Sequence, residues 1–172
     1  MKKFFETLSP YLIPFLERGI SIAAFIFPFV EIVSYFGPKV FLSTESFALK
    51  SFYVTYIEKI ARFYTGNNLL IFFFMVWVFI ICSRRSSRLT KFVRFNVIQA
   101  ILLNIICSCF GVVFTFLPIV LRESILGVVI SNLLFFSIVL LIGYSSLLIA
   151  YGRLPVIPIV SEAAKIQVQR DF

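Results

Sequence analysis

Residues 94–104, RFNVIQAILLN, place an arginine, two asparagines and a glutamine in a segment that is otherwise apolar. At about 100° per residue, one face of a helix would carry Asn96, Gln99, Ala100, Leu103 and Cys107, with Asn104 at its edge. A buried amide without a hydrogen-bond partner costs free energy, above all in hydrocarbon. The segment therefore predicts a helix that turns its amide face toward other helices or a water-filled cavity and away from lipid.

The composition of the whole chain predicts a membrane protein. Of its 172 residues, 60 % are hydrophobic and 14 % are charged, and the mean hydropathy is +1.02. Soluble domains contain about 25 % charged residues on average. The chain has too few polar residues to cover an apolar core in water, so we expect lipid to be the solvent for most of it.

Four segments are long and apolar enough to cross a hydrocarbon core of about 30 Å as helices. They cover about residues 19–37, 65–83, 95–121 and 124–151, and a C-terminal tail follows at 152–172. Transmembrane strands are disfavoured because apolar and polar residues do not alternate in runs such as LLIFFFMVWVFII. We therefore predict an all-α membrane protein, in which residues 1–172 form a single integral membrane domain of four transmembrane helices.

Two segments beside these spans also carry helix signals. Residues 9–19, SPYLIPFLERG, predict a short opening helix that is capped by Ser9 and ends at Gly19. Residues 41–63 carry apolar side chains at helical spacing, which predicts an interfacial amphipathic helix between the first and second spans. Its apolar face consists of Phe47, Phe52, Tyr56, Ile60 and Phe63.

The basic residues divide unequally between the two sides that four spans define. The side that holds both termini and the loop after the second span carries Lys2, Lys3, Arg84, Arg85, Arg88, Lys91, Arg94, Arg153, Lys165 and Arg170. The opposite side carries Lys39, Lys50, Lys59, Arg62 and Arg122. Because cytoplasmic segments of membrane proteins are enriched in Lys and Arg, we expect both termini in the cytoplasm or its organellar equivalent.

Two charged residues fall within or next to the spans. Glu31 follows Pro28 in the first span, and we interpret it either as a carboxylate facing a polar pathway or as one at the membrane interface. The interfacial interpretation is favoured, because the apolar run that remains after Glu31 is short. Arg94, at the start of the third span, is expected to snorkel to the interface or to contact lipid phosphate.

The fourth span offers a face that could match the amide face of the third. This face carries Asn132, Phe136, Val139, Gly143, Ser146 and Ala150. Its small residues would let another helix approach closely. The polar candidates of all the spans are Glu31, Asn96, Gln99, Asn104, Asn132 and Ser146. They are interpreted either as interhelical hydrogen-bonding groups, worth about 1 kcal/mol each, or as the lining of a polar path, and the sequence leaves both open.

The residue types exclude the common catalytic sites. The chain contains no histidine, and its only aspartate is Asp171, which removes Ser-His-Asp triads, zinc-protease motifs and paired aspartates. We therefore expect no enzymatic activity, no cofactor or metal, and no nucleic-acid partner. Cys82, Cys107 and Cys109 lie in the spans and are expected to be buried as small apolar residues.

Three stretches resemble a known family. FVRFNVIQAILLNI at 92–105 resembles the RFNxxQAILLDI signature of the Tic-twenty (Tic20) family, the small channel-forming subunit of the translocon at the inner envelope of chloroplasts. RLPVIPIVSEAAKIQV at 153–168 resembles the closing PxIPLISDAADAQV, and residues 9–19 resemble YLLPLLDGL. The matching residues include Arg94, Phe95, Asn96, Gln99, Ala100, Pro155, Ile157, Pro158, Ser161, Ala163 and Ala164. Asn104, Glu162 and Glu17 stand where the family usually has aspartate.

The resemblance implies a role in moving preproteins across the inner envelope as part of the import channel, with both termini in the stroma. It also implies other envelope translocon subunits, preproteins, membrane lipid and further copies of the chain as partners. The start of the chain does not resemble a transit peptide, so we expect a plastid-encoded member. A cyanobacterial homologue in a plasma membrane is the alternative.

Two other function classes are considered. A scaffold subunit that never touches substrate would share the sequence features above. A small-solute transporter would be expected to show inverted repeats with interrupted helices meeting at the midplane, and the sequence shows no such halves. The channel interpretation is therefore preferred to the transporter, while channel and scaffold are not separated by the sequence.

Overall fold

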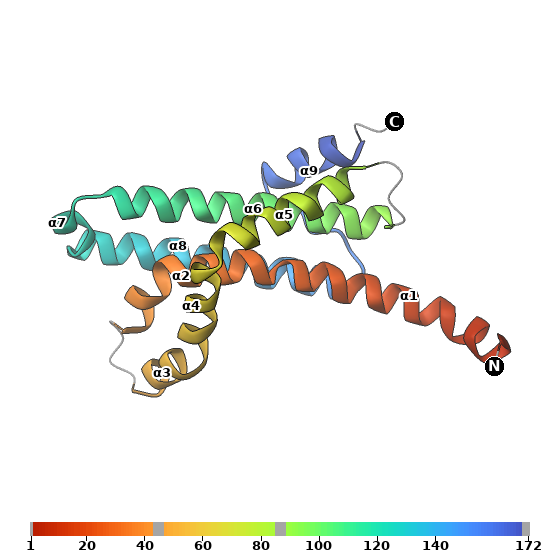
Figure 1. Cartoon of the computed structure of the whole chain (residues 1–172), viewed down its shortest axis with the longest axis horizontal. Coiled ribbons are helices and arrows are strands. Elements are labelled where there is room, and N and C mark those ends of the chain that lie inside the picture. Colours follow the sequence, from red (N-terminus) through yellow and green to blue (C-terminus); the bar gives the residue numbers. More distant parts are fainter. Residues whose placement is uncertain (1, 43–46, 85–88, 170–172) are drawn as a thin grey trace.

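The computed structural model describes residues 2–42, 47–84 and 89–169, and every regular element in these ranges is a helix (Figure 1). The all-α prediction is therefore confirmed. In chain order the elements are α1 (Lys2–Ala24), α2 (Ile26–Leu42), α3 (Phe47–Phe52), the π-helical segment η1 (Tyr53–Ile57), α4 (Glu58–Gly66), α5 (Asn68–Ser83), α6 (Lys91–Phe116), α7 (Ile119–Arg122), α8 (Ile125–Ala150) and α9 (Val160–Gln169).

The membrane spans correspond to three long helical stretches and one bent pair. Among the described residues, Ile13–Phe41, Lys91–Phe116 and Ile125–Ala150 are long and apolar enough to cross a membrane. Helix α5 passes the same test only together with the helix before it, as the pair Lys50–Gly66 and Asn68–Ser83, which is bent by 79°. The second of the four predicted spans thus contains a sharp bend near its start.

The first span is longer than predicted, and its break lies elsewhere. Helix α1 continues through Gly19, so the separate opening helix predicted for residues 9–19 was wrong. A glycine inside a helix costs only about 1 kcal/mol relative to alanine, so it does not by itself end one. The interruption lies at Phe25. Three residues later, Pro28 has no amide hydrogen to donate to the carbonyl of Ala24, and its ring crowds that carbonyl, which explains a break here.

The segment between the first two spans is helical, as predicted, but in three pieces. Helices α3 and α4 flank η1 and together cover Phe47–Gly66, while residues 43–46 of the predicted helix lie outside the described ranges. The apolar face predicted from the sequence is exposed at Phe47, Phe52, Tyr56, Ile60 and Phe63. Tyr53, Ala61 and Tyr64 are buried instead. The exposed apolar face suits a membrane surface, and that location stays a prediction.

Helix α2 is the centre of the bundle. It packs along both α6 and α8 and also contacts α4. Phe36 of α2 lies 5.2 Å from Phe114 of α6 between ring centroids, and Phe41 meets Phe135 of α8 edge to face at 5.6 Å. Because α2 has partners on several sides, its apolar residues Ile32, Val33 and Phe36 are almost completely buried.

The packed face of α8 differs from the predicted one. The buried residues of α8 are Gly127, Ser131, Phe135, Ile138, Ile142, Ser145 and Ile149. The predicted face lies at the bundle surface, where Phe136 is 54 % exposed and no heavy atom lies within 4 Å of a Cβ built on Gly143. The main partners of α8 are α1 and α2, not α6. The predicted match between the third and fourth spans was therefore wrong, because α2 packs against both helices.

The ends of the bundle differ in what they gather (Figure 1). The first turns of α1, the end of α5, the start of α6 and helix α9 lie toward one end, and α7 lies at the opposite end. This arrangement brings Arg84 and Lys91 to the end where the chain begins and finishes. The direction of the bundle across the membrane stays a prediction from the charge distribution.

We predict that Gly111→Ala destabilises the protein and that Gly143→Ala does not. A Cβ at Gly111 would collide with the ring of Tyr35, whereas one at Gly143 meets no atom within 4 Å. Overpacking of this kind costs about 1–3 kcal/mol, while alanine favours an open helix position by up to about 1 kcal/mol. Thermal unfolding of the detergent-solubilised protein measures the difference. Equal melting temperatures for the two variants would contradict the packing of α2 on α6.

Candidate functional site

The amide side chains of α6 all lie inside the bundle. Asn96, Gln99 and Asn104 are at most 1 % exposed, and they extend along α6 from its first turns to its middle. The helix contacts α1, α2, α5 and α9, so its surroundings are protein on several sides. The amide face is therefore turned away from lipid, and the surroundings of each amide differ.

Gln99 joins α6 to the C-terminal segment. Its Nε2 donates to Ser161 Oγ at 2.6 Å and to the Pro155 carbonyl at 3.4 Å. The same Ser161 Oγ accepts a hydrogen bond from the Ile157 amide at 2.6 Å, across the turn that leads into α9. The two sequence motifs around Gln99 and Ser161, which are 62 residues apart, therefore meet in one buried polar contact. Nothing in the sequence alone predicts this pairing.

Arg94 is buried and serves as a cap for α5. It is 6 % exposed, and its Nε donates to the Cys82 carbonyl at 2.5 Å while a terminal nitrogen reaches the Ser83 carbonyl at 3.4 Å. The last carbonyls of a helix have no partner within the helix and carry partial negative charge. The expectation that Arg94 snorkels to the interface or contacts lipid phosphate was wrong, because the end of α5 offers these acceptors close by.

The amides of α6 are not fully satisfied. Asn96 Nδ2 donates to the Phe92 carbonyl of its own helix at 3.0 Å. The side-chain oxygens of Asn96, Gln99 and Asn104 are buried and accept no hydrogen bond from the part of the chain that the structure describes. Buried acceptors of this kind usually bind ordered water or another polar group. The polar face of α6 therefore has acceptor capacity that the packing alone does not use.

Glu31 lies in the middle of the bundle rather than at the interface. It is 4 % exposed, and the helical stretch that contains it continues to Phe41, so the interfacial interpretation was wrong. Ser108 Oγ of α6 donates to Glu31 Oε1. No Lys or Arg forms an ion pair with Glu31 within residues 2–42, 47–84 and 89–169. An uncompensated negative charge would be expensive at this position.

A small polar cavity adjoins Glu31 at the bend between α4 and α5. Its volume is about 90 Å³, and it is lined by Glu31, Ser34, Tyr35, Tyr64, Thr65 and Asn68. The Tyr64 hydroxyl is buried and lies beside the side chains of Glu31 and Asn104. The cavity is small, and the residues that enclose it come from α2, α4 and α5. It offers room for a few water molecules and none for a polypeptide.

The remaining predicted residues divide between buried and exposed positions. Phe95, Ala100, Pro155, Ile157 and Ala164 are buried, whereas Pro158 and Ala163 are exposed. Cys82 and Cys107 are buried as expected, but Cys109 is exposed on the surface of α6, so that part of the cysteine prediction was wrong. No group of three or more Cys, Asp or Glu side chains in the described ranges could hold a metal ion.

Asn132 and Ser146 lie on the outer face of α8. Both are half-buried, and neither side chain forms a hydrogen bond within the described ranges. Gly143 and Ala150 are exposed on the same face. These four residues, here called the α8 stripe, are the polar and small residues that the bundle leaves at its surface on this helix face. Unlike the amides of α6, they are not enclosed by the bundle, and they lie along the flank of α8 beside its packed face.

Comparisons with known proteins agree on one family. A family model described as "Chloroplast import apparatus Tic20-like" matches residues 8–164. The chain is 31 % identical over 162 residues to the Tic20 family protein Ycf60 of Gracilaria tenuistipitata var. liui, covering 93 % of this chain and 79 % of the relative. It is 31 % identical over 153 residues to the Tic20 family protein Ycf60 of Pyropia yezoensis and 30 % over 153 residues to that of Porphyra purpurea, in both cases covering 88 % of this chain and 75 % of the relative.

We predict that Gln99→Leu releases α9 from α6. The variant loses the hydrogen bond to Ser161, and the buried Ser161 hydroxyl keeps one hydrogen-bond partner fewer. The expected loss in the free energy of unfolding is about 1–3 kcal/mol. Hydrogen exchange should accelerate in α9, and Ser161→Ala should have a similar effect. Ser137→Ala, at an exposed position of α8, is the matched control. Unchanged protection of α9 in Gln99→Leu would show that the contact does not hold the helix.

We predict that Glu31→Gln preserves stability and that Glu31→Lys abolishes folding. Glutamine keeps the size of the side chain and can still accept the hydrogen bond from Ser108. A lysine ammonium would place a charge among the same buried groups. The yield of monodisperse protein and its melting temperature measure both effects. A loss of stability in Glu31→Gln as large as that in Glu31→Lys would show instead that the negative charge is essential.

Proposed function

Because the chain belongs to the Tic20 family of the chloroplast import apparatus, we propose that it forms one wall of the preprotein path in the inner-envelope translocon. Family membership confirms the resemblance predicted from the sequence and the expectation of a non-enzymatic membrane component. The wall is the α8 stripe, defined by Asn132, Gly143, Ser146 and Ala150. The path then runs along the outside of the bundle, between this chain and other subunits or copies.

The interior of the bundle supports a path outside it. Gln99 is held by Ser161, Arg94 is held by the end of α5, and Glu31 contacts Ser108. These contacts connect helices of the same chain and would have to break before a polypeptide could pass between them. A chain of 19.8 kDa is also too small to surround an unfolded polypeptide comfortably. Several subunits around one axis supply that space more readily.

The observation that carries the proposal is an amide and a hydroxyl group on α8 that have no hydrogen-bond partner in the described part of the bundle. Asn132 and Ser146 are half-buried and without hydrogen-bond partners in the described ranges, and a polar group facing hydrocarbon is unfavourable. Water in a path, or polar groups of a neighbouring subunit, would satisfy them. Gly143 and Ala150 add no bulk, so a passing chain or another helix can approach the backbone closely.

The proposal also covers the membrane in which the chain lies and the direction of its helix bundle across that membrane. We place the chain in the inner envelope membrane as a multi-pass protein, with the end that holds Arg84, Lys91 and α9 on the stromal side. The excess of Lys and Arg there supports this direction. Neighbouring translocon subunits, translocating preproteins and further copies of the chain are the partners. A scaffold role is the second candidate, and the closed contacts around Gln99 and Glu31 favour it.

Site-specific photo-crosslinking with a preprotein arrested during import tests the proposal. Probes are placed at Asn132 and Ser146 on the α8 stripe, at Gln99 in the interior, and at Phe73, an exposed apolar residue of α5, as the lipid-facing control. We expect adducts with the preprotein at Asn132 and Ser146 and none at Gln99 or Phe73.

The outcomes separate the two candidate functions. Adducts at Asn132 and Ser146 only with other envelope proteins, while import proceeds, would assign the chain a scaffold role. Preprotein adducts at Gln99 would instead place the path inside the bundle, and the proposed wall would be wrong.

A further inference from the structure

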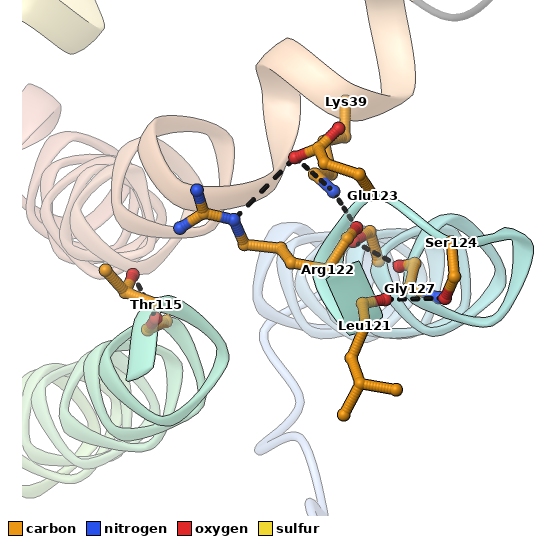
Figure 2. A network of polar contacts seen from close by, with 9 residues as sticks. Lys39, Thr115, Leu121, Arg122, Glu123, Ser124 and Gly127 are labelled. Carbon is orange, nitrogen blue, oxygen red and sulfur yellow. Dashed lines mark hydrogen bonds and ion pairs between the residues drawn. The ribbon is translucent and has the colours of Figure 1, made fainter. Parts of the chain in front are cut away.

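A cluster of charged residues joins α2 to the loop between α6 and α8, at the end of the bundle opposite α9 (Figures 1 and 2). Lys39 Nζ donates to the Arg122 carbonyl and pairs with Glu123 Oε1 at 3.2 Å. Arg122 Nε lies 3.7 Å from the same carboxylate oxygen. Two cations therefore share one anion, which leaves the cluster with a net charge of about +1.

An open pocket of about 460 Å³ lies beside this cluster. Tyr35 and Lys39 line it from α2, Phe114 and Thr115 from the last turns of α6, and Arg122 and Glu123 from the loop. The Lys39 ammonium is also 5.3 Å from the centre of the Phe114 ring. Its side chain is only 18 % exposed, so its charge acts in a partly desolvated setting where electrostatic attraction is stronger than in water.

Arg122 supplies the group that could recognise an anion. Figure 2 shows its Nε directed at Glu123 while the two terminal nitrogens point away from the network. Within the part of the chain that the structure describes, those terminal nitrogens form no hydrogen bond or ion pair. A guanidinium with two parallel N–H groups matches the oxygens of a phosphate or sulfonate, which it can bind through two hydrogen bonds at once.

The apolar residues around the loop bear on where the pocket lies across the membrane. Helix α6 ends at Phe116 and α8 begins at Ile125. Phe116, Ile119, Val120 and Ile125, at or between these two helix ends, are all largely exposed. Exposed apolar side chains at the end of a membrane span are stable where they contact lipid. We therefore expect the pocket to lie at the level of the lipid headgroups, next to a surface that acyl chains can cover.

We propose that the pocket formed by Lys39 and Arg122 binds the headgroup of an anionic membrane lipid. The terminal nitrogens of Arg122 donate to two oxygens of the phosphate or sulfonate, and the Lys39 ammonium adds its charge from the α2 side. Glu123 orients both cations and limits the affinity through its own charge. The bound lipid would link α2 to the loop between α6 and α8. This inference does not depend on the preprotein path proposed above.

Lipid retention by the purified full-length chain tests this inference. The protein is solubilised in detergent with phosphatidylglycerol or phosphatidylcholine, and native mass spectrometry counts the lipids that remain bound. We expect preferential retention of phosphatidylglycerol and a loss of about fivefold in Arg122→Gln, since one basic residue near an anionic surface contributes about 1 kcal/mol. Arg153→Gln, which removes an exposed arginine after α8, is the matched control and should not change retention.

A second variant is expected to raise phosphatidylglycerol retention instead of lowering it. Glu123→Gln removes the competing carboxylate, so phosphatidylglycerol retention should rise, an effect that partial unfolding would not produce. Equal retention of the two lipids by the unmodified protein, or no change in Arg122→Gln, would overturn the proposal. Inorganic phosphate provides the remaining comparison. If it binds at the pocket while phosphatidylglycerol is not preferred, the site takes a free anion and the assignment to lipid is wrong.

Discussion

In hydrocarbon a polar side chain must find its partner within the protein, and the packing of this chain follows from that constraint. Helix α6 carries Arg94, Gln99 and Ser108, whose side-chain hydrogen bonds reach three other helices. Arg94 caps the end of α5, Gln99 holds the segment before α9 through Ser161, and Ser108 reaches Glu31 on α2. These hydrogen bonds connect α6 to its neighbours, while apolar residues of α2, α6 and α8 pack together in the larger of the two core clusters.

The need for hydrogen-bond partners applies equally to the polar groups that the bundle does not enclose. Arg94, Gln99 and Glu31 have partners on other helices of the bundle, whereas the half-buried side chains of Asn132 and Ser146 have none among the described residues. The proposed wall would supply them with protein or water that the isolated chain lacks. At the opposite end from α9, the guanidinium of Arg122 shows a related pattern, because its terminal nitrogens point away from the network of charged residues. Both features agree with the proposed place of this chain in an assembly and a bilayer.

Composition and sequence motifs predicted the helical membrane fold and the buried face of α6. The other features depend on packing between helices that are distant in the sequence. The low charge content and long apolar runs were sufficient for an all-α membrane fold, and the spacing of Asn96 and Gln99 identified the buried face of α6. The packed face of α8 could not be predicted, because this helix is apolar on nearly all sides and offers no clear period. The roles of Arg94 and Ser161 depend on contacts between distant segments, which a single sequence does not reveal.

We propose that the interior of the bundle is closed and that the α8 stripe faces protein or water in the assembled translocon. A nitroxide scan of α8 in the assembled complex measures what the stripe faces, using oxygen as the lipid-soluble relaxant and a nickel chelate as the aqueous one. We expect few oxygen collisions at positions 132 and 146 and many at the exposed leucines 133 and 147. Equal oxygen accessibility at all four positions would mean that lipid covers the stripe, and the proposed wall would be wrong.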